Sequence, residues 1–273
     1  MGEIKHLRLP ERLYLTDWRN LAWDVFQYQY FDAVVIHAPT HLIPYLGTSL
    51  AMMLKNFHRP VVFYGEDWQE EQAAQWARHC ANGIYALGTG GLYLACRTSF
   101  LPERGIFSPY EAPVGVIENG VYCFYRNRVP RQSSDPPMVC DAVNEKIGMV
   151  LPGYMFAKLG TLLEKDAYFV MLDGSRSSID WLFTDKRDML NRLRRAQIPV
   201  VVHGLPPVVR DPELRRMILR SGVILTGDMT REAALVKLMW TMARTGAPEG
   251  VRLYFSLNFA GETSQEQPPL VAR

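Results

Sequence analysis

Residues 32–65, DAVVIHAPTHLIPYLGTSLAMMLKNFHRPVVFYG, hold two short apolar runs on either side of a helical segment. The runs at 32–37 and 60–65 predict buried parallel strands, because strands covered on both faces are apolar throughout. Between them, apolar residues recur at helical spacing, namely Leu46, Leu50, Met53 and Leu54. A strand, a helix and a second strand in this order are typical of an α/β layer fold.

The same alternation continues on both sides of this stretch. A helical period covers residues 18–26, and GIYAL at 83–87 predicts a further strand. DWQEEQAAQWARHCANG predicts a helix with Asp67 as its N-cap. The second half predicts strands at KIGMVLPG, YFVMLDG, PVVVHG and GVILTG, and a last helix capped by Thr230 and ended by Gly246.

Composition divides the chain into four parts. Residues 1–128 form an N-terminal α/β domain, and the polar, proline-rich segment 129–145 is a linker. Residues 146–260 form a second α/β domain. The tail 261–273 has no apolar pattern, and we expect it to be flexible.

Charge and cysteine usage narrow the class of protein. A net charge of +2 gives no reason to expect nucleic acid as a partner, and the basic runs in the second half alternate with acidic residues, as on solvated helix faces. No apolar run approaches the roughly 20 residues that span a bilayer, and the N-terminus lacks the apolar core of a signal peptide. The four scattered cysteines favour reduced thiols. Together these features predict a cytoplasmic protein with no membrane partner.

The glycine-rich motif GTGG at 88–91 allows three interpretations: a phosphate-binding loop, a displayed threonine nucleophile, or a β-hairpin. A phosphate-binding loop is followed by a helix, but this motif is followed by LYLACRTS, which reads as a strand. A glycine turn between two strands predicts a hairpin with Thr89 at its exposed tip.

Several of these motifs resemble the bacterial-type (threonine-dependent) L-asparaginases. Residues 34–65 resemble the family pattern VVITHGTDTM, a small-residue helix, ML-x-N and PVV-x-x-G. GIYALGTGGLYLACRTSF resembles the family's hairpin, FSPYEAPVGVI its SSP-N-x-P-x-G-x-I, and SGVILTGDMTREAALVKLMW its GG-D-M-T-x-E-A-A-L-x-K-L. The resemblance implies an asparaginase-like α/β fold, with a larger N-terminal parallel-sheet domain followed by a smaller C-terminal α/β domain. It also implies subunits that assemble with sites between them.

The positions that match the family's reactive residues differ from its pattern. The family's nucleophile is a threonine of a T-G-G-T motif on the first strand, whereas this chain starts at EIKHLRL, which matches a later strand. The family's D-S-S substrate loop falls on residues 9–12, without the serines. Thr40 and His41 stand for the family's T-D pair, Arg97 for its catalytic lysine, and Cys96 for the threonine before it. The chain thus resembles an N-terminally truncated and degenerate member.

These changes disfavour hydrolysis by the family's mechanism. A desolvated lysine can lose its proton and activate a threonine, but an arginine with a pKa above about 12 cannot. A histidine also lacks the fixed negative charge that holds a substrate ammonium. Other roles stay open: Thr40 as a helix cap, Arg97 as an ion-pair residue, and His41 as a base for Thr40.

Metal binding has little support in the sequence. His37, His41 and His203 fall at predicted strand ends, but they lack metal-ligand spacing. Asp173 and Asp228 read as turn and cap residues. We therefore predict neither a metal nor a cofactor.

The favoured function is that of a pseudoenzyme, an asparaginase-like protein that binds a small ligand or acts as an assembly partner. The ligand would be amino-acid-like or a dicarboxylate, held by Thr40, His41, Cys96 and Arg97. The alternative is an amidohydrolase or acyl transferase on a small amino-acid-like amide, alone or as part of a heteromer. A component of a tRNA-dependent amidotransferase is least favoured, because such subunits keep the family's reactive T-T-D-K residues, which this chain lacks.

The charge changes favour dicarboxylates over asparagine, because aspartate to histidine removes a negative charge and lysine to arginine keeps a positive one, now with a bidentate donor fork. We also expect a homo-oligomer or a heteromer. If the sheet lacks a strand, the apolar faces of the helices at 46–54 and 235–242 would be exposed to water unless another subunit covers them.

Overall fold

The computed structural model describes residues 2–130, 133–151, 164–206 and 210–264. The chain forms two compact units, Met1–Ala142 with Phe259–Glu262, and Val143–Asn258 with Thr263–Arg273. Of the expected flexible tail, residues 265–273 lie outside the described residues. The preceding Glu262 and Thr263 are buried.

Unit 1 is built on a seven-stranded sheet with the order β1-β2-β4-β5-β6-β9-β10. Its first four strands run parallel, and β6, β9 and β10 are antiparallel. The bounds are β1 Ile4–Arg8, β2 Ala33–His37, β4 Pro60–Tyr64, β5 Gly83–Gly88, β6 Gly91–Leu94, β9 Gly115–Glu118 and β10 Val121–Phe124. The strands predicted around residues 32–37, 60–65 and 83–87 are confirmed. EIKHLRL forms β1, which stands at the edge of the sheet.

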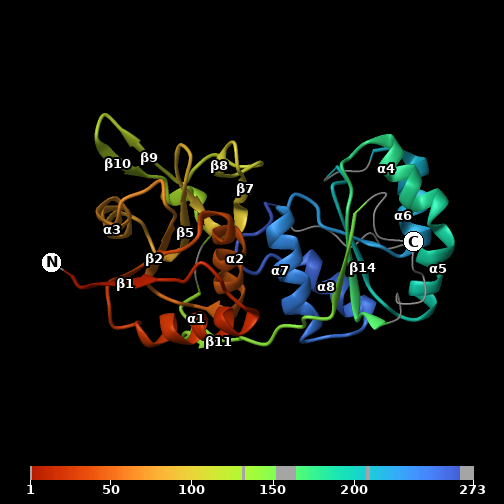
Figure 1. Cartoon of the computed structure of the whole chain (residues 1–273), viewed down its shortest axis with the longest axis horizontal. Coiled ribbons are helices and arrows are strands. Elements are labelled where there is room, and N and C mark those ends of the chain that lie inside the picture. The colour runs from red at the N-terminus through yellow and green to blue at the C-terminus, as the bar shows by residue number, and fades with distance from the viewer. Residues whose placement is uncertain (1, 131–132, 152–163, 207–209, 265–273) are drawn as a thin grey trace. The chain divides into compact units, whose positions relative to one another are not determined.

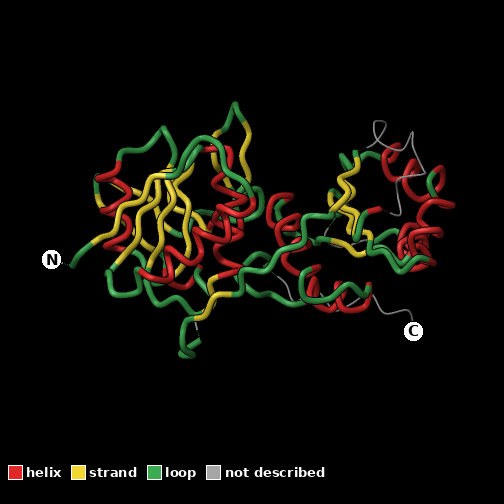
Figure 2. The backbone as a smooth tube through the Cα atoms, turned by 60° about the horizontal axis from the view of Figure 1, so that its bottom comes forward, coloured by secondary structure: helices red, strands yellow, loops and turns green. Residues whose placement is uncertain are grey.

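Helices cover both faces of this sheet, as Figures 1 and 2 show. On one face, Trp76 of α3 (Glu70–His79) packs in a cluster with Val62 and Tyr85. On the other, Gly47 of α2 (Ile43–Met53) packs on β4 and on the 3-10 turn after β6, where a Cβ would lie 3.8 Å from Phe63 Cδ2 and 2.4 Å from Ala95 Cβ. α1 (Leu15–Gln27) packs on α2. The burial of both faces explains why the inner parallel strands β2 and β4 are largely apolar.

The GTGG motif is the turn of a hairpin, as predicted. β5 pairs with β6 antiparallel, and Thr89 is exposed between them. Gly90 takes a φ of +92°, in the region that glycine adopts without strain. Two small antiparallel pairs complete the unit, β7 (Ser99–Leu101) with β8 (Gly105–Phe107), and β3 (Leu54–Lys55) with β11 (Met138–Val139).

Unit 2 has a four-stranded parallel sheet in the order β12-β13-β14-β15. The four strands are those predicted from sequence, with residues 152–153 of the first predicted strand outside the described residues. The bounds are β12 Ile147–Val150, β13 Ala167–Met171, β14 Val200–His203, β15 Ile224–Leu225, α4 Arg176–Asp180, α5 Arg187–Arg195, α6 Pro212–Ser221, α7 Arg231–Met242 and α8 Pro248–Ser256.

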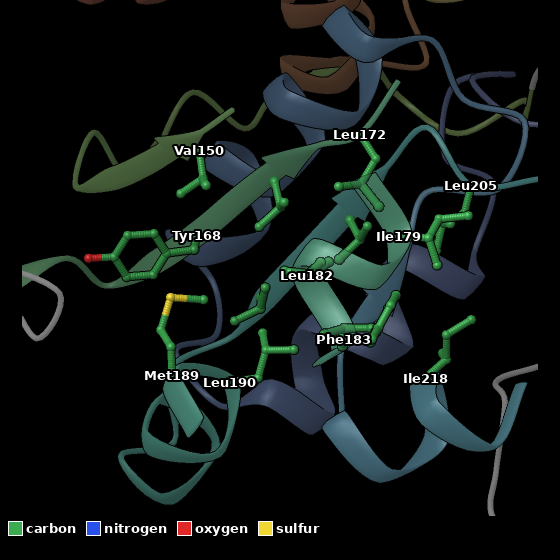
Figure 3. Packing of buried hydrophobic residues seen from close by; sticks show 14 of the residues in the cluster. Val150, Tyr168, Leu172, Ile179, Leu182, Phe183, Met189, Leu190, Leu205 and Ile218 are labelled. Atoms are coloured by element: carbon green, nitrogen blue, oxygen red, sulfur yellow. The ribbon is translucent and has the colours of Figure 1, made fainter. Parts of the chain in front are cut away.

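Each face of this second sheet has its own apolar cluster. Leu182, Phe183, Leu190 and Ile218 cover one face, and Figure 3 shows them packed beside strands β12 and β13. α7 and α8 cover the other face. Thr230 caps α7 by accepting a hydrogen bond from the backbone of the third residue along, as predicted.

α7 ends at Met242, so the prediction that Gly246 ends it is wrong. The helix closes on Ala243, whose backbone N–H bonds within the last turn. In the described ranges, no helix is long and apolar enough to cross a membrane.

Candidate functional site

A cleft of about 1150 Å³ opens at the carboxyl ends of the parallel strands of unit 1. Each strand contributes residues that follow its last pair: Arg12 after β1, Thr40 after β2, Asp67 after β4 and Thr89 after β5. Parallel strands end at one edge of a sheet, and ligands of open α/β sheets bind at that edge. We call this space the main cleft.

Thr40 and Glu66 form the hydrogen-bonded centre of the main cleft. The Thr40 hydroxyl donates to Glu66 Oε2, and the Thr40 backbone N–H donates to the same oxygen at 3.3 Å. In return, the Glu66 backbone N–H donates to Thr40 Oγ1 at 3.3 Å. The hydroxyl bond is the main reason that the pKa of Glu66 lies below its usual value. Glu66 therefore stays ionised at neutral pH.

Thr40 does not cap the following helix. It opens a short 3-10 helix, Thr40–Leu42, and the N-cap of α2 is Leu42, without a side-chain cap bond. Thr40 lines the main cleft, and its hydroxyl donates a hydrogen bond to Glu66. The helix-cap alternative for Thr40 is therefore wrong.

Gly65 leaves the space that Thr40 occupies. A Cβ at residue 65 would lie 2.2 Å from Thr40 Oγ1 and 3.2 Å from Thr40 Cα. Only glycine leaves room for the threonine to reach the neighbouring carboxylate.

Replacing this glycine is expected to destabilise the protein. Gly65→Ala should lower the free energy of unfolding by about 1–3 kcal/mol, because the methyl group displaces both the side chain and the backbone of Thr40. Urea unfolding measures the loss. Gly246→Ala is the matched control, since a Cβ there meets nothing within 4 Å. Wild-type stability in Gly65→Ala would contradict the packing described here.

Charged side chains of both signs line the main cleft. The acidic ones outnumber the guanidiniums, with Glu11, Glu66, Asp67 and Glu103 against Arg12 and Arg104. Among the described residues, no carboxylate lies within ion-pair distance of either guanidinium. The Arg104 guanidinium lies over the Phe107 ring, 4.4 Å from its centroid. The cleft therefore suits a ligand with both a positive and a negative group.

Thr89 lines the main cleft, but its hydroxyl is already engaged. It donates to the Arg104 carbonyl at 2.6 Å, and the Thr89 backbone N–H donates to the Ile106 carbonyl at 2.7 Å. These bonds tie the GTGG turn to the β7–β8 hairpin that carries Arg104. Thr89 therefore positions the wall of the cleft, and a role as a displayed nucleophile has no support.

Arg97 and Cys96 lie outside the lining of the main cleft. Arg97 is 1% exposed; its Nη2 pairs with Glu111 Oε1 at 2.9 Å and its Nη1 donates to the Glu262 carbonyl at 2.7 Å. The Cys96 thiol donates to the Ala260 carbonyl at 3.2 Å, and burial raises its pKa. The structure thus brings Thr40 and His41 into one cleft, whereas Arg97 and Cys96 are buried and do not line it. The ion-pair alternative for Arg97 agrees with this geometry.

The histidines named in the sequence are divided between the two units. His41 lines the main cleft with its ring 6.3 Å from that of Phe100, whereas His203 belongs to unit 2 and hydrogen-bonds Thr226. Within the described ranges, no group of three His, Cys, Asp or Glu side chains is placed to hold a metal ion.

The two aspartates of unit 2 hold backbone and hydroxyl groups. Asp173 accepts from the backbone N–H and hydroxyl of Ser175 before α4, and these bonds lower its pKa to about 2. Asp228 accepts from the hydroxyls of Thr263 and Ser264.

Sequence reasoning missed Glu66, Arg12 and Arg104. Glu66 directly follows a predicted strand, as Thr40 follows the one before it, so the same strand-end argument could have found it. Asp67 was expected to cap the next helix, and that prediction is wrong. The N-cap of α3 is Gln69, whose backbone N–H donates to the Gln72 side chain, while Asp67 lines the cleft.

Comparisons with known proteins agree with the fold. No protein-family model matches the chain. It is 26% identical over 267 residues to the L-asparaginase of Thermococcus kodakarensis, covering 90% of this chain and 80% of that protein. It is 25% identical over 269 residues to a glutamyl-tRNA(Gln) amidotransferase subunit of Pyrococcus abyssi, covering 85% of this chain but only 59% of that subunit. The solved thermostable L-asparaginase from Thermococcus kodakarensis matches with a TM-score of 0.76 at 23% identity, over 93% of this chain and 83% of that one.

The protein therefore has the asparaginase fold, with a large sheet that contains parallel strands and a smaller parallel-sheet unit. It is asparaginase-like in sequence over most of its length, and its relatives include both L-asparaginases and amidotransferase subunits.

Proposed function

We propose that the protein binds a small amino acid, or a ligand with an amino-acid head, in the main cleft and does not hydrolyse L-asparagine or L-glutamine there. The observation that carries the proposal is the Glu66 carboxylate, held ionised by Thr40 in a cleft that also contains two guanidiniums without carboxylate partners among the described residues.

The two charged ends of an amino acid have matching groups in this cleft. The Glu66 carboxylate would hold the ammonium, in place of the acidic residue that the asparaginase pattern has at position 41. Arg12, on the loop that matches the family's substrate loop, would hold the carboxylate through its two parallel N–H groups. A ligand with both charges leaves neither group desolvated and unpaired.

This assignment changes the ligand preference expected from sequence. Preference for a dicarboxylate depended on Arg97 in the cleft and on the loss of a negative charge there. Arg97 is buried against Glu111, and Glu66 supplies a negative charge to the cleft. We therefore expect an ammonium group to be required.

Glu66→Gln is expected to weaken the binding of L-aspartate and L-asparagine at least about tenfold, because it removes a charge-assisted hydrogen bond. Isothermal titration measures the dissociation constants. Succinate, which lacks the ammonium, should bind the wild type more weakly than L-aspartate and should not be weakened by the substitution.

The matched control is Glu71→Gln, an exposed carboxylate of α3 outside the main cleft. It should bind as the wild type does. Succinate binding as tightly as L-aspartate would refute the proposal, as would equal affinities in Glu66→Gln and the wild type.

An amidohydrolase or acyl transferase that works within a heteromer is the second candidate. It is favoured by the relatives that are named as subunits of a larger enzyme. In that case a second chain would supply the reactive group that the main cleft lacks among its described residues. Ammonia release that appears only when such a partner is added would support this candidate.

A further inference from the structure

A second cavity of about 960 Å³ adjoins the main cleft in unit 1. The two spaces share Glu11, Pro39 and Glu66 in their linings. They therefore adjoin at the carboxylate to which the amino-acid head is assigned. The second cavity extends from there along β1 towards the start of α3.

Flat and apolar groups form much of the second cavity. Tyr64 and Trp68 belong to its lining, together with Leu7, Leu9 and Pro10. The His37 ring stands edge-on to Tyr64, with 5.1 Å between the ring centroids. Such faces bind aromatic rings by stacking and edge contacts.

Several polar groups of this cavity already have partners. His6 Nδ1 pairs with Glu70 Oε1 at 2.8 Å, and the Tyr64 hydroxyl donates to Glu70 at 3.3 Å. Burial is the main cause that raises the pKa of Tyr64, so its hydroxyl stays a neutral donor. Tyr64 is itself 6% exposed, so the partly exposed ring of Trp68 is the main flat surface that this cavity offers to a ligand.

Size gives the second argument. Pockets for drug-sized ligands measure about 300–1,000 Å³. The main cleft alone, at about 1150 Å³, exceeds what a free amino acid needs, and the second cavity adds a comparable volume. A ligand whose head lies at Glu66 can fill both only if it carries a substituent that crosses Glu66 and Pro39.

We propose that the natural ligand is an amino acid extended by an aromatic or similarly flat apolar substituent, with its head in the main cleft and its substituent against Trp68 and Tyr64. The proposal rests on the amino-acid head site described under the proposed function.

The test compares L-asparagine with its N-substituted side-chain amides, the methyl amide, the anilide and the 2-naphthylamide. On the wild type, affinity should rise through this series, with the anilide at least about tenfold tighter than L-asparagine, because the ring buries apolar area. The methyl amide should gain little. Affinities that do not increase with aromatic area would overturn the inference without any variant being needed.

Two variants locate the ring. Trp68→Ala should remove most of the anilide's advantage and leave L-asparagine binding unchanged, whereas Glu66→Gln should weaken both compounds. Tyr30→Ala is the control, because this tyrosine is 86% exposed and lines neither cavity. An anilide advantage that persists in Trp68→Ala would overturn the assignment of the second cavity.

The outcomes also separate this inference from the proposed function. If L-asparagine binds but the amides gain nothing, only the extended ligand is refuted. If no compound of the series binds the wild type, the amino-acid head site and the inference both fail.

Discussion

The purified protein should release no ammonia from L-asparagine or L-glutamine, with a rate at least about 10⁴-fold below that of the Thermococcus kodakarensis L-asparaginase assayed beside it. Removal of one member of a coupled catalytic set commonly forfeits most of the rate, and several members differ here. An enzyme-coupled ammonia assay with both proteins at equal concentration measures the difference.

The physical reason lies in the surroundings of Thr40. Its hydroxyl donates to Glu66, and a carboxylate whose pKa is lowered is a weak base for removing a hydroxyl proton. In the described lining of the main cleft there is no lysine, and the guanidinium at position 97 is buried and cannot act as a base. The Thr40 hydroxyl bonds only to Glu66 among the described residues, and no hydrogen bond joins it to His41, so the alternative of His41 as its base has no support in this geometry.

Thr40→Ala distinguishes a true activity from a contaminant. Steady ammonia release that is lost in Thr40→Ala would show that the protein is an active amidohydrolase, and the non-hydrolytic proposal would then be wrong. Release that persists in Thr40→Ala does not depend on Thr40, and it belongs to a contaminant if it separates from the protein during further purification.

The parallel strands and the helices between them were largely accessible from sequence, because burial on both faces leaves a simple signal, whereas the order of the strands in the sheet was not predicted. β2 and β4 are continuous apolar runs, and the helix between them shows its period clearly. The hairpin followed from a glycine turn between two strands. Helix ends were less accessible, because Asp67 is by residue type a better N-cap than Gln69 and only the path of the chain places the cap at Gln69.

The residues of the candidate site could be predicted from the sequence only in part. Thr40 and His41 directly follow a strand, so the strand's direction fixes them at the cleft edge. Arg97 also follows a strand by a few residues, but a 3-10 turn at Ala95–Arg97 directs its long side chain inward, to Glu111 and the carbonyl of Glu262. Residue type and spacing cannot give that direction. It depends on contacts with residues distant in the sequence.

Glu111→Gln should destabilise unit 1. It removes the carboxylate that pairs at 2.9 Å with the Arg97 guanidinium, which is 1% exposed. Because Glu111 is about a third exposed, the expected cost is that of a lost charge-assisted hydrogen bond, about 1–3 kcal/mol, which corresponds to a fall of about 5 °C in the melting temperature. Urea unfolding and calorimetry measure both quantities.

Glu118→Gln is the matched control, because this glutamate is exposed on β9 and accepts a hydrogen bond from the Tyr125 hydroxyl at the surface. It should change the free energy of unfolding by less than about 0.5 kcal/mol. A similar small effect in Glu111→Gln would show that the buried guanidinium does not depend on this carboxylate.

A double-mutant cycle then separates a structural from a ligand-binding role for Arg97. Arg97→Met removes the buried charge and leaves Glu111, about a third exposed, able to reach water. The double variant Arg97→Met/Glu111→Gln should therefore be more stable than the sum of the two single losses predicts, by about 1–3 kcal/mol. Additive losses would mean that the two side chains are not coupled.

In Arg97→Met, L-aspartate should still raise the melting temperature, because Arg97 does not line the main cleft. Loss of that response in a folded variant would instead return Arg97 to the ligand site that the family resemblance implied.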